Sequence, residues 1–385
     1  MERIYLDHAA TTPARPEVVQ AMLPHFGGHN PSSLHAEGRE ARAALDRARE
    51  DIARGLNAKS KEIVFTGSGS EADNLAIFGV ARARKDHGRH IVSSTFEHHA
   101  VLHALDALAE RGWEISLIPV SELGAIDLSA FAEAIREDTV LASVMYANNE
   151  LGTLQPIAAL AELAHAKGAL FHTDAIQVPA HLRIDVAALG VDLLSLSAHK
   201  FYGPKGVGAL FARDGVPLAP QVLGGSQEFS RRAGTQNVAG AVGMAAAFEL
   251  AQAQLGETTP RIRDLRNRFE DTLLAEIPQI RINGRGLPRL PNISNISFAG
   301  VDGDALLLRL DLEGIAVSSG SACASGAVEP SHVIAALGID AAWQRGVVRF
   351  SLGIGTRPEQ IDHVLAVLRA VIPELREVEQ TFSAQ

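Results

Sequence analysis

The chain has 385 residues, which is enough for two or three domains of roughly 150 residues each. With 46% hydrophobic and 21% charged residues it can bury a sizeable core, so it belongs neither to the fibrous nor to the largely disordered proteins. A formal net charge of −10 argues against a general affinity for nucleic acid or for anionic membranes.

Two absences in the sequence restrict the cell compartment and the kinds of metal or disulfide chemistry that we expect. The N-terminal residues contain no apolar signal core, and no uninterrupted apolar run reaches the roughly 18 residues of a membrane span. Cys323 is the single cysteine, so this chain alone can form no intrachain disulfide, multi-cysteine zinc site or iron–sulfur cluster. We therefore expect a cytoplasmic enzyme that contacts neither membranes nor nucleic acid directly.

Short β-rich runs alternate with helical stretches through the middle of the chain. Strands are expected at residues 62–66, 90–94, 113–120, 140–146, 169–173, 192–197 and 208–211. Helices are expected at residues 71–84, 100–111 and 128–136, and another has Pro156 in its first turn and Gly168 at its close. This alternation predicts an α/β fold with a mostly parallel sheet covered by helices, in which ligands bind beyond the carboxyl ends of the strands.

The pattern changes near Thr258. A charged helix at 261–274, a strand at 293–298, a helix at 303–312, a strand at 347–352 and a final helix after Pro358 are expected there. We therefore predict a large domain over residues 15–257 and a smaller α+β domain over residues 258–385. The N-terminal segment 1–14 is expected to belong to the smaller domain, which also carries the Cys323 loop.

A glycine-rich turn, residues 67–70, joins an expected strand to an expected helix. Its glycines allow tight backbone packing, and free N–H groups at a helix start favour a phosphate. The same residues match the G-x-G-x-x-A pattern of dinucleotide sites, with Glu97 as a possible ribose-binding acid. A plain turn, a phosphate site and a dinucleotide site all remain open from this motif alone.

Polar residues also follow two later strands. Asp174 lies at a predicted strand end, where a carboxylate is either a helix cap or turn former, or part of a site. Residues 197–200 follow the next strand and end in Lys200. Alone, that segment is equally compatible with a polar loop carrying a solvated lysine.

Lysine is used sparingly, since only six of the 35 basic residues are lysines. An amine that must lose its proton to form an imine has to be lysine, because arginine does not deprotonate. Only Lys200 lies directly at a strand's carboxyl end, with Lys205 as the nearest rival. The others lie in a turn or near helix ends: Lys59, Lys61, Lys85 and Lys167. Lys200 is the best imine candidate.

Cys323 lies in a run of serine, glycine and alanine at residues 318–326. A free cysteine is usually a small buried hydrophobe, but these neighbours are too small and polar for a packed helix or strand. A mobile loop with an accessible thiol suits a nucleophile that must travel. By contrast, His98, His99 and His103 lack the carboxylate of the H-E-x-x-H pattern, so we expect no metal site.

Together these motifs resemble the cysteine desulfurases, which are pyridoxal-phosphate (PLP) enzymes of the class V aminotransferase group. The likeness runs from residues 5–13 through residues 30–35 to residues 349–352, which is nearly the whole chain in the expected order. The Cys323 loop and residues 329–332 resemble the long-loop branch, which supplies sulfur for iron–sulfur clusters and other pathways. The resemblance implies the aspartate-aminotransferase-like PLP fold type I.

The resemblance also implies residue roles. Lys200 would hold the cofactor as a Schiff base and move a proton, and Asp174 would pair with the protonated pyridine nitrogen. Gln177 and Asn149 would bond the phenolic oxygen of the ring, and His98 would stack on its face as a further catalytic residue. The phosphate would be held by Gly69, Ser70, Ser197, His199 and Thr235, the last reaching over from a second subunit.

The reaction implied by the resemblance converts L-cysteine into L-alanine. Arg349 and Asn149 would bind the substrate, with Arg349 holding its carboxylate through two hydrogen bonds. The Cys323 thiolate would attack the substrate sulfur and become a persulfide, from which a protein acceptor such as a cluster scaffold takes the sulfur. The expected assembly is a homodimer with shared active sites.

Other readings of the same residues make different predictions. An ordinary aminotransferase would use Lys200 and Asp174 but not a mobile cysteine. A selenocysteine-specific lyase need not depend on Cys323, because selenide leaves more readily. A cofactor-less scaffold would be colourless. A dinucleotide site would leave Lys200, Asp174 and Cys323 without a role.

Overall fold

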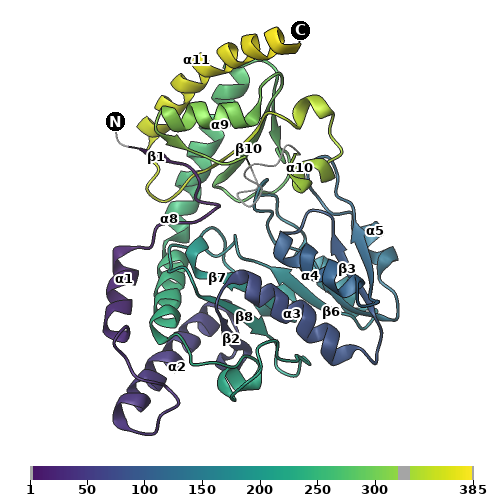
Figure 1. The fold of residues 1–385 in the computed structure, drawn as a ribbon, viewed down its shortest axis with the longest axis vertical. Helices are drawn as coiled ribbons and strands as arrows, with labels where there is room; N and C mark the ends of the chain where they lie inside the picture. Colours follow the sequence, from purple (N-terminus) through teal and green to yellow (C-terminus); the bar gives the residue numbers. More distant parts are fainter. Residues whose placement is uncertain (1–2, 320–329, 384–385) are drawn as a thin grey trace.

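The computed structural model describes residues 3–319 and 330–383. The predicted Cys323 loop overlaps residues 320–329, so Cys323 itself lies outside the described residues. The chain folds into a larger part at the lower end of Figure 1 and a smaller part at the upper end, with α8 (Val238–Glu276) running between them.

A seven-stranded sheet forms the larger part, with the strand order β2-β8-β7-β6-β5-β3-β4. The strands from β7 to β4 along this order are parallel to one another, whereas β8 is antiparallel to β7 and to β2. The predicted mostly parallel sheet is therefore confirmed. The strands are β2 (Ile63–Thr66), β3 (His90–Ser94), β4 (Glu114–Ile118), β5 (Thr139–Ser143), β6 (Leu170–Asp174), β7 (Leu193–Ser197) and β8 (Gly208–Ala212).

Helices cover both faces of this sheet because successive strand residues point to opposite sides. Val64 and Leu193 belong to the apolar cluster beneath α3 and α4, whereas Phe65 and Leu194 belong to the cluster beneath α2, α6 and α8. The helices of this part are α1 (Pro16–Met22), α2 (Ala36–Leu56), α3 (Gly69–Arg84), α4 (His99–Ala109), α5 (Leu128–Ala134), α6 (Ile157–His165) and α7 (Val186–Leu189).

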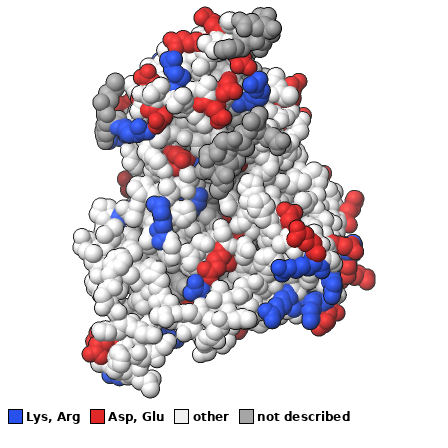
Figure 2. Space-filling view, in the orientation of Figure 1, with Lys and Arg blue, Asp and Glu red and all other residues white. Residues whose placement is uncertain are grey.

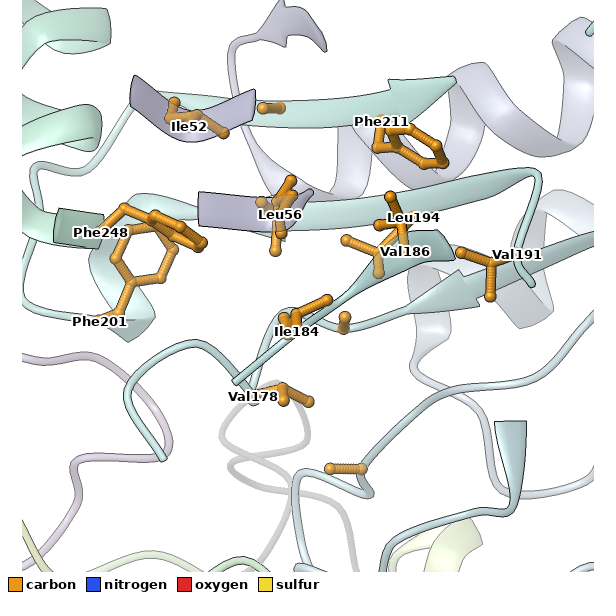
Figure 3. Close-up of a cluster of buried hydrophobic side chains, with 14 of the residues drawn as sticks. Ile52, Leu56, Val178, Ile184, Val186, Val191, Leu194, Phe201, Phe211 and Phe248 are labelled. Carbon is orange, nitrogen blue, oxygen red and sulfur yellow. The ribbon is translucent and has the colours of Figure 1, made fainter. Parts of the chain in front are cut away.

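Figure 3 shows part of the second cluster, where Ile52 and Leu56 of α2 lie beside residues of the sheet. Phe201 and Phe248 meet edge to face, with ring centroids 5.9 Å apart. Both rings are fully buried, so the first half of α8 is fixed against the segment that follows β7.

The smaller part has its own core around an antiparallel sheet with the order β12-β10-β9. Near the chain's start, β1 pairs in parallel with β11, which brings the N-terminal segment into this part. The elements are β1 (Ile4–Tyr5), β9 (Ile280–Asn283), β10 (Ile293–Phe298), β11 (Ile315–Ala316), β12 (Val347–Ser351), α9 (Gly303–Leu312), α10 (His332–Ala336) and α11 (Pro358–Ser383).

α8 contributes to both cores. Met244 and Phe248 pack in the larger part, whereas Ile262 and Phe269 pack in the smaller part. The predicted boundary between residues 257 and 258 falls inside this helix, and the division into those two domains stays a prediction. By length and composition alone α8 could cross a bilayer, but its buried residues in two cores identify it as a core helix.

Most predicted elements of the α/β region are present, with small shifts at their ends. The strands predicted at 90–94 and 293–298 and the helix predicted at 303–312 coincide with β3, β10 and α9. One detail was wrong: α6 begins at Ile157, and Pro156 is its N-cap, because the ψ angle of Pro156, 66°, is not helical. The sequence did not predict α1, α2, α7, α10, β9, the β1–β11 pair or the first half of α8.

Candidate active site

A cavity of about 300 Å³ lies at the carboxyl edge of the seven-stranded sheet. Its walls come from the residues that follow β2, β3, β5, β6 and β7 and from both ends of the chain. The lining residues are Ala9, Ala10, Ser68, Gly69, Ser70, His98, His99, Met145, Ala147, Asn149, Glu150, Asp174, Ile176, Gln177, Ser197, His199, Lys200, His332 and Arg349.

This cavity brings together ten of the residues predicted to form a site. They are Gly69, Ser70, His98, Asn149, Asp174, Gln177, Ser197, His199, Lys200 and Arg349. Thr235 is not among them: within its own chain it lines a different hollow, together with His25 and Phe26. Cys323 lies outside the described residues. The rival Lys205 does not line the cavity.

The glycine turn, residues 67–70, leads directly into α3. The side chain of Ser68 caps the helix by accepting a hydrogen bond from Glu71 N at 3.1 Å. A Cβ atom on Gly69 would lie 2.3 Å from Ile176 Cδ1 and 3.1 Å from Ser197 Cβ, so only glycine fits here without displacement. The turn therefore brings backbone N–H groups of a helix start to the cavity wall, an arrangement that binds anions.

Lys200 follows β7 and reaches across to the N-terminal segment. Its Nζ donates hydrogen bonds to the carbonyl oxygens of Ala9 at 2.6 Å and Ala10 at 2.9 Å. Gln177 Nε2 donates to the same Ala9 oxygen at 2.9 Å. These contacts hold the lysine amine at the wall of the cavity, beside the side chain of Gln177.

Asp174, the last residue of β6, is buried and has two functions. Its Oδ1 accepts a hydrogen bond from Ile176 N at 2.9 Å, so it does form a turn, and it also lines the cavity. Burial raises the pKa of this carboxyl above its usual range, whereas the Ile176 N–H and the charge of Lys200 act in the opposite direction. A cationic group beside Asp174 would favour its ionised form.

His98 caps α4 and presents a neutral ring to the cavity. Its Nδ1 accepts a hydrogen bond from Ala100 N at 3.1 Å, so the proton of the neutral ring lies on Nε2. Burial, assisted by the charge of Lys200, lowers the pKa of His98 to about 4. An uncharged aromatic ring suits stacking on a flat ligand.

Arg349 brings the smaller part of the molecule into the site. It lies on β12, and its side chain is 2% exposed. Nη2 donates to Asp7 Oδ1 at 2.8 Å, and Nη1 donates to the carbonyl oxygen of Asn149 at 2.8 Å. The guanidinium is thereby held in place at the cavity wall, where it can bind a carboxylate.

Two residues of the site had no predicted role. Asp7 does not line the cavity but is the partner of Arg349, and Glu150 lines the cavity beside Asn149. Glu150 is 1% exposed and accepts a hydrogen bond from Ser331 Oγ at 2.8 Å. Burial raises its pKa to about 7. The contact between Asp7 and Arg349 spans 342 residues, so no local pattern indicates it. For Asp7, the only indication in the sequence was its place in residues 5–13, where the family resemblance begins.

The dinucleotide reading finds little support in this geometry. Glu97 is fully buried and accepts hydrogen bonds from Met145 N and Ser94 Oγ, so it does not face the cavity as a ribose ligand would. In the described ranges, 3–319 and 330–383, no group of three or more His, Cys, Asp or Glu could hold a metal ion. His99 instead stacks on His103 at 4.9 Å and lies 4.4 Å from His332, measured between ring centroids.

Comparisons with known proteins place this chain in a family. Residues 4–364 match the family model described as aminotransferase class-V. A protein named cysteine desulfurase IscS from Dictyoglomus turgidum is 48% identical over 379 residues, covering 97% of this chain and 96% of the relative. The chain therefore belongs to the class-V aminotransferase family. Within that family it groups with the cysteine desulfurases, which are PLP-dependent enzymes.

Solved structures agree with this grouping. One named NifS-like protein is 34% identical with a TM-score of 0.91, covering 97% of this chain and 100% of its own. Another, named SspA in complex with cysteine, is 35% identical with a TM-score of 0.80, covering 91% of this chain and 98% of its own. The PLP fold type I architecture predicted from the sequence is confirmed.

Proposed function

We propose that this chain is a PLP-dependent cysteine desulfurase that converts L-cysteine into L-alanine and keeps the sulfur as a persulfide on Cys323. One observation carries the proposal: Lys200, Asp174 and Arg349 line a single cavity of about 300 Å³. These side chains provide an amine, a buried carboxylate and a fixed guanidinium, which is the set that PLP chemistry on an amino acid requires.

The residues of the cavity fit the cofactor. The close approach of Gly69 to Ile176 and Ser197 leaves the start of α3 as a cradle that a side chain would fill. Ser70, Ser197 and His199 add polar groups for a phosphate, and the neutral ring of His98 offers a stacking face. When bound, PLP withdraws electrons from the substrate and weakens its carbon–sulfur bond.

The chain's own residues then have distinct tasks. Lys200 would attach the cofactor through Nζ and move a proton once the substrate amine replaces it. Asp174, in its ionised form, would hold the proton on the pyridine nitrogen. Arg349, held by Asp7 and Asn149, would bind the substrate carboxylate and so fix the side chain of the amino acid in one orientation.

Cys323 would supply the sulfur-accepting thiolate. As the thiolate attacks the substrate sulfur, a sulfur–sulfur bond forms and the substrate carbon–sulfur bond breaks. The products are L-alanine and a persulfide on Cys323, and the step needs no external oxidant or reductant. A protein acceptor, in iron–sulfur cluster assembly or another sulfur pathway, would take the sulfur in the cytoplasm.

We further propose a homodimer in which Thr235 completes the phosphate site of the partner. Within its own chain Thr235 lies away from the cavity. Phe26 lines the same hollow as Thr235 and is 66% exposed. Leu223 is 71% exposed and follows Val222, whose carbonyl oxygen accepts a hydrogen bond from Ala233 N. A second copy covering these residues would remove this surface from water.

The decisive experiment combines cofactor chemistry with sulfur transfer. The purified protein should be yellow, and borohydride should abolish the visible band and fix the cofactor on Lys200. Cys323→Ala should keep that band and still change its spectrum with L-cysteine, but release almost no sulfide and form no persulfide. A label on Lys205, or undiminished desulfuration by Cys323→Ala, would contradict the assignment. Activity retained only with selenocysteine would indicate a selenocysteine lyase.

A further inference from the structure

The segment at residues 224–237, between β8 and α8, carries Thr235 and has an unusual backbone. Glu228, Phe229 and Ser230 have left-handed φ angles of 47°, 58° and 64°. Residues other than glycine rarely adopt this region, because it places Cβ too close to the following carbonyl oxygen. Three such residues in sequence persist only where surrounding contacts hold them.

A buried ion pair supplies one set of these contacts. Arg49 on α2 donates to both carboxylate oxygens of Glu228, at 2.6 and 2.8 Å, and the two side chains are 4% and 1% exposed. The guanidinium lies between the rings of Phe65 and Phe229, 4.8 and 5.1 Å from their centroids. Gln236 Nε2 donates to Glu228 Oε1 at 3.3 Å. Glu228 therefore fixes the segment to α2, and through Gln236 it also joins the two halves of the segment to each other.

A second ion pair joins the same segment to the glycine turn. Arg232 Nε donates to Glu71 Oε1 at 2.8 Å, and Glu71 Oε2 accepts a hydrogen bond from Gly67 N at 2.7 Å. A Cβ on Gly67 would lie 2.8 Å from Glu71 Oε2 and 3.8 Å from Arg232 Nη2, so the pair lies directly on the turn. The carboxylate of Glu71 thus connects the anchored segment with the backbone that precedes Gly69 and Ser70.

We propose that Arg232 and Glu71 are positioning residues for the phosphate site. Their ion pair fixes the glycine turn of a chain against the segment that carries Thr235 of the same chain. This inference rests on the proposed function, since it takes the turn as the phosphate site of PLP. Neither residue lines the cavity, so both act through the turn rather than by touching the cofactor.

Because the Arg232–Glu71 pair is partly exposed, we expect it to contribute little to folding stability. The side chains of Arg232 and Glu71 are 24% and 26% exposed, and ion pairs near solvent add little to folding stability. Loss of the pair should therefore appear in the affinity for the phosphate group and much less in the melting temperature.

Binding to the cofactor-free protein tests the proposal. Glu71→Gln, which can still accept from Gly67 N, and Arg232→Ala should each weaken PLP and inorganic phosphate binding about five- to tenfold. The double variant should lose no more affinity than the single variant that binds more weakly, because both changes remove the same contact. Arg232→Lys should recover part of the affinity. Pyridoxal, which lacks the phosphate, should bind all variants as it binds the original protein.

A matched control is Arg281→Ala, which removes an arginine of similar exposure, 26%, that faces Glu122 in another part of the molecule. It should leave phosphate affinity unchanged. Additive losses in the double variant, a loss confined to Arg232→Ala, or an equal loss for pyridoxal would each overturn the proposal. If Arg232→Ala does not fold, Glu71→Gln and Arg232→Lys still decide. An original protein that binds no PLP would refute the proposed function instead.

Discussion

At the residue scale, Asp174 combines a local and a chemical role. Its Oδ1 fixes the backbone after β6 through Ile176 N, which asparagine could also do. Asp174→Asn should therefore fold and bind PLP, but lose desulfuration by roughly two orders of magnitude, because a neutral amide no longer stabilises the proton on the pyridine nitrogen. Turnover of L-cysteine by the cofactor-loaded variant measures this effect.

A matched control for that variant is Asp192→Asn. Asp192 is also buried, and it accepts hydrogen bonds from Phe171 N at 2.8 Å and His165 Nε2 at 2.7 Å, but it does not line the cavity. This variant should lose stability and keep its turnover number. A near-normal rate for Asp174→Asn would mean that Asp174 is only a turn former.

Glu97 predicts how stability changes with pH. Burial, only partly opposed by hydrogen bonds from Ser94 and Met145, raises the pKa of Glu97 from 4.5 to about 8. The folded protein therefore keeps a proton that the unfolded chain releases, and this stabilisation is present below about pH 4.5 and lost as the pH rises toward 8. The buried histidines act in the opposite sense, since a pKa of about 3 for His172 and His181 costs stability only below about pH 6.5.

The range from pH 7 to 8 therefore isolates the buried carboxyl groups. The free energy of unfolding should fall there by up to about 1.4 kcal/mol per pH unit for Glu97. Glu97→Gln, which keeps the uncharged shape, should flatten this slope in denaturant titrations at pH 7.0, 7.5 and 8.0. An unchanged slope in the variant would show that Glu97 does not hold a proton in the folded state.

The sequence predicted which residues would meet at one cavity where chemistry and chain position coincide. Lys200 and Asp174 each follow a strand, and parallel strands share a carboxyl edge, so their meeting at one cavity follows from the β/α alternation. Asp7 and Glu150 had no such signal. Asp7 reaches Arg349 because β1 pairs with β11 in the smaller part of the fold. No local sequence pattern indicates that pairing.

At the element scale, the start of α3 depends on one glycine. Gly69→Ala would place its Cβ 2.3 Å from Ile176 Cδ1, so the turn or its neighbours must move. We expect a loss of about 1–3 kcal/mol in unfolding free energy and a clear loss of PLP affinity, measured by denaturation and by the visible band. Gly256→Ala is the control: nothing lies within 4 Å of its Cβ position in α8, so the added methyl should stabilise the helix by about 0.5–1 kcal/mol. Unchanged PLP affinity in Gly69→Ala would contradict the close packing at this turn.

The elements differ in how clearly the sequence indicated them, and burial explains the difference. Strands such as β3 are short, apolar and bounded by polar turns, so their ends were predicted closely. The first half of α8 is rich in alanine and glycine and is buried on several sides, so it lacks the polar stripe that identifies an amphipathic helix. α8 also continues through Pro260, whereas the prediction began the helix directly after that proline.

At the scale of the whole molecule, two regions of the surface differ in character: one is charged, and the other, near Thr235, is apolar. Acidic and basic side chains are interspersed over the upper end of the face in Figure 2, near α9 and α11. With a net charge of −10, this mixture gives no strong attraction for a polyanion at that end of the face, and protein partners stay a prediction. The exposed apolar residues beside Thr235 suit a larger and drier contact, such as that with a second copy.

Mixed dimers test whether the active sites are shared. Lys200→Ala should be inactive, and Thr235→Ala should be weakened by poorer phosphate binding. If Thr235 acts across the interface, a dimer of one Lys200→Ala chain and one Thr235→Ala chain contains one intact site, since the chain with Lys200 receives Thr235 from its partner. After subunit exchange, the purified mixed dimer should show about half the activity of the original dimer.

The control exchanges Lys200→Ala with Ser70→Ala. Ser70 lines the same cavity as Lys200 within one chain, so no combination of these two chains restores a complete site. That mixture should stay near half the activity of the Ser70→Ala dimer. If the Thr235→Ala mixture behaves in the same way, at half the activity of its own dimer, Thr235 serves its own chain. A fully active monomer in sedimentation experiments would exclude shared sites, because a single chain would then complete the phosphate site without the Thr235 of a partner.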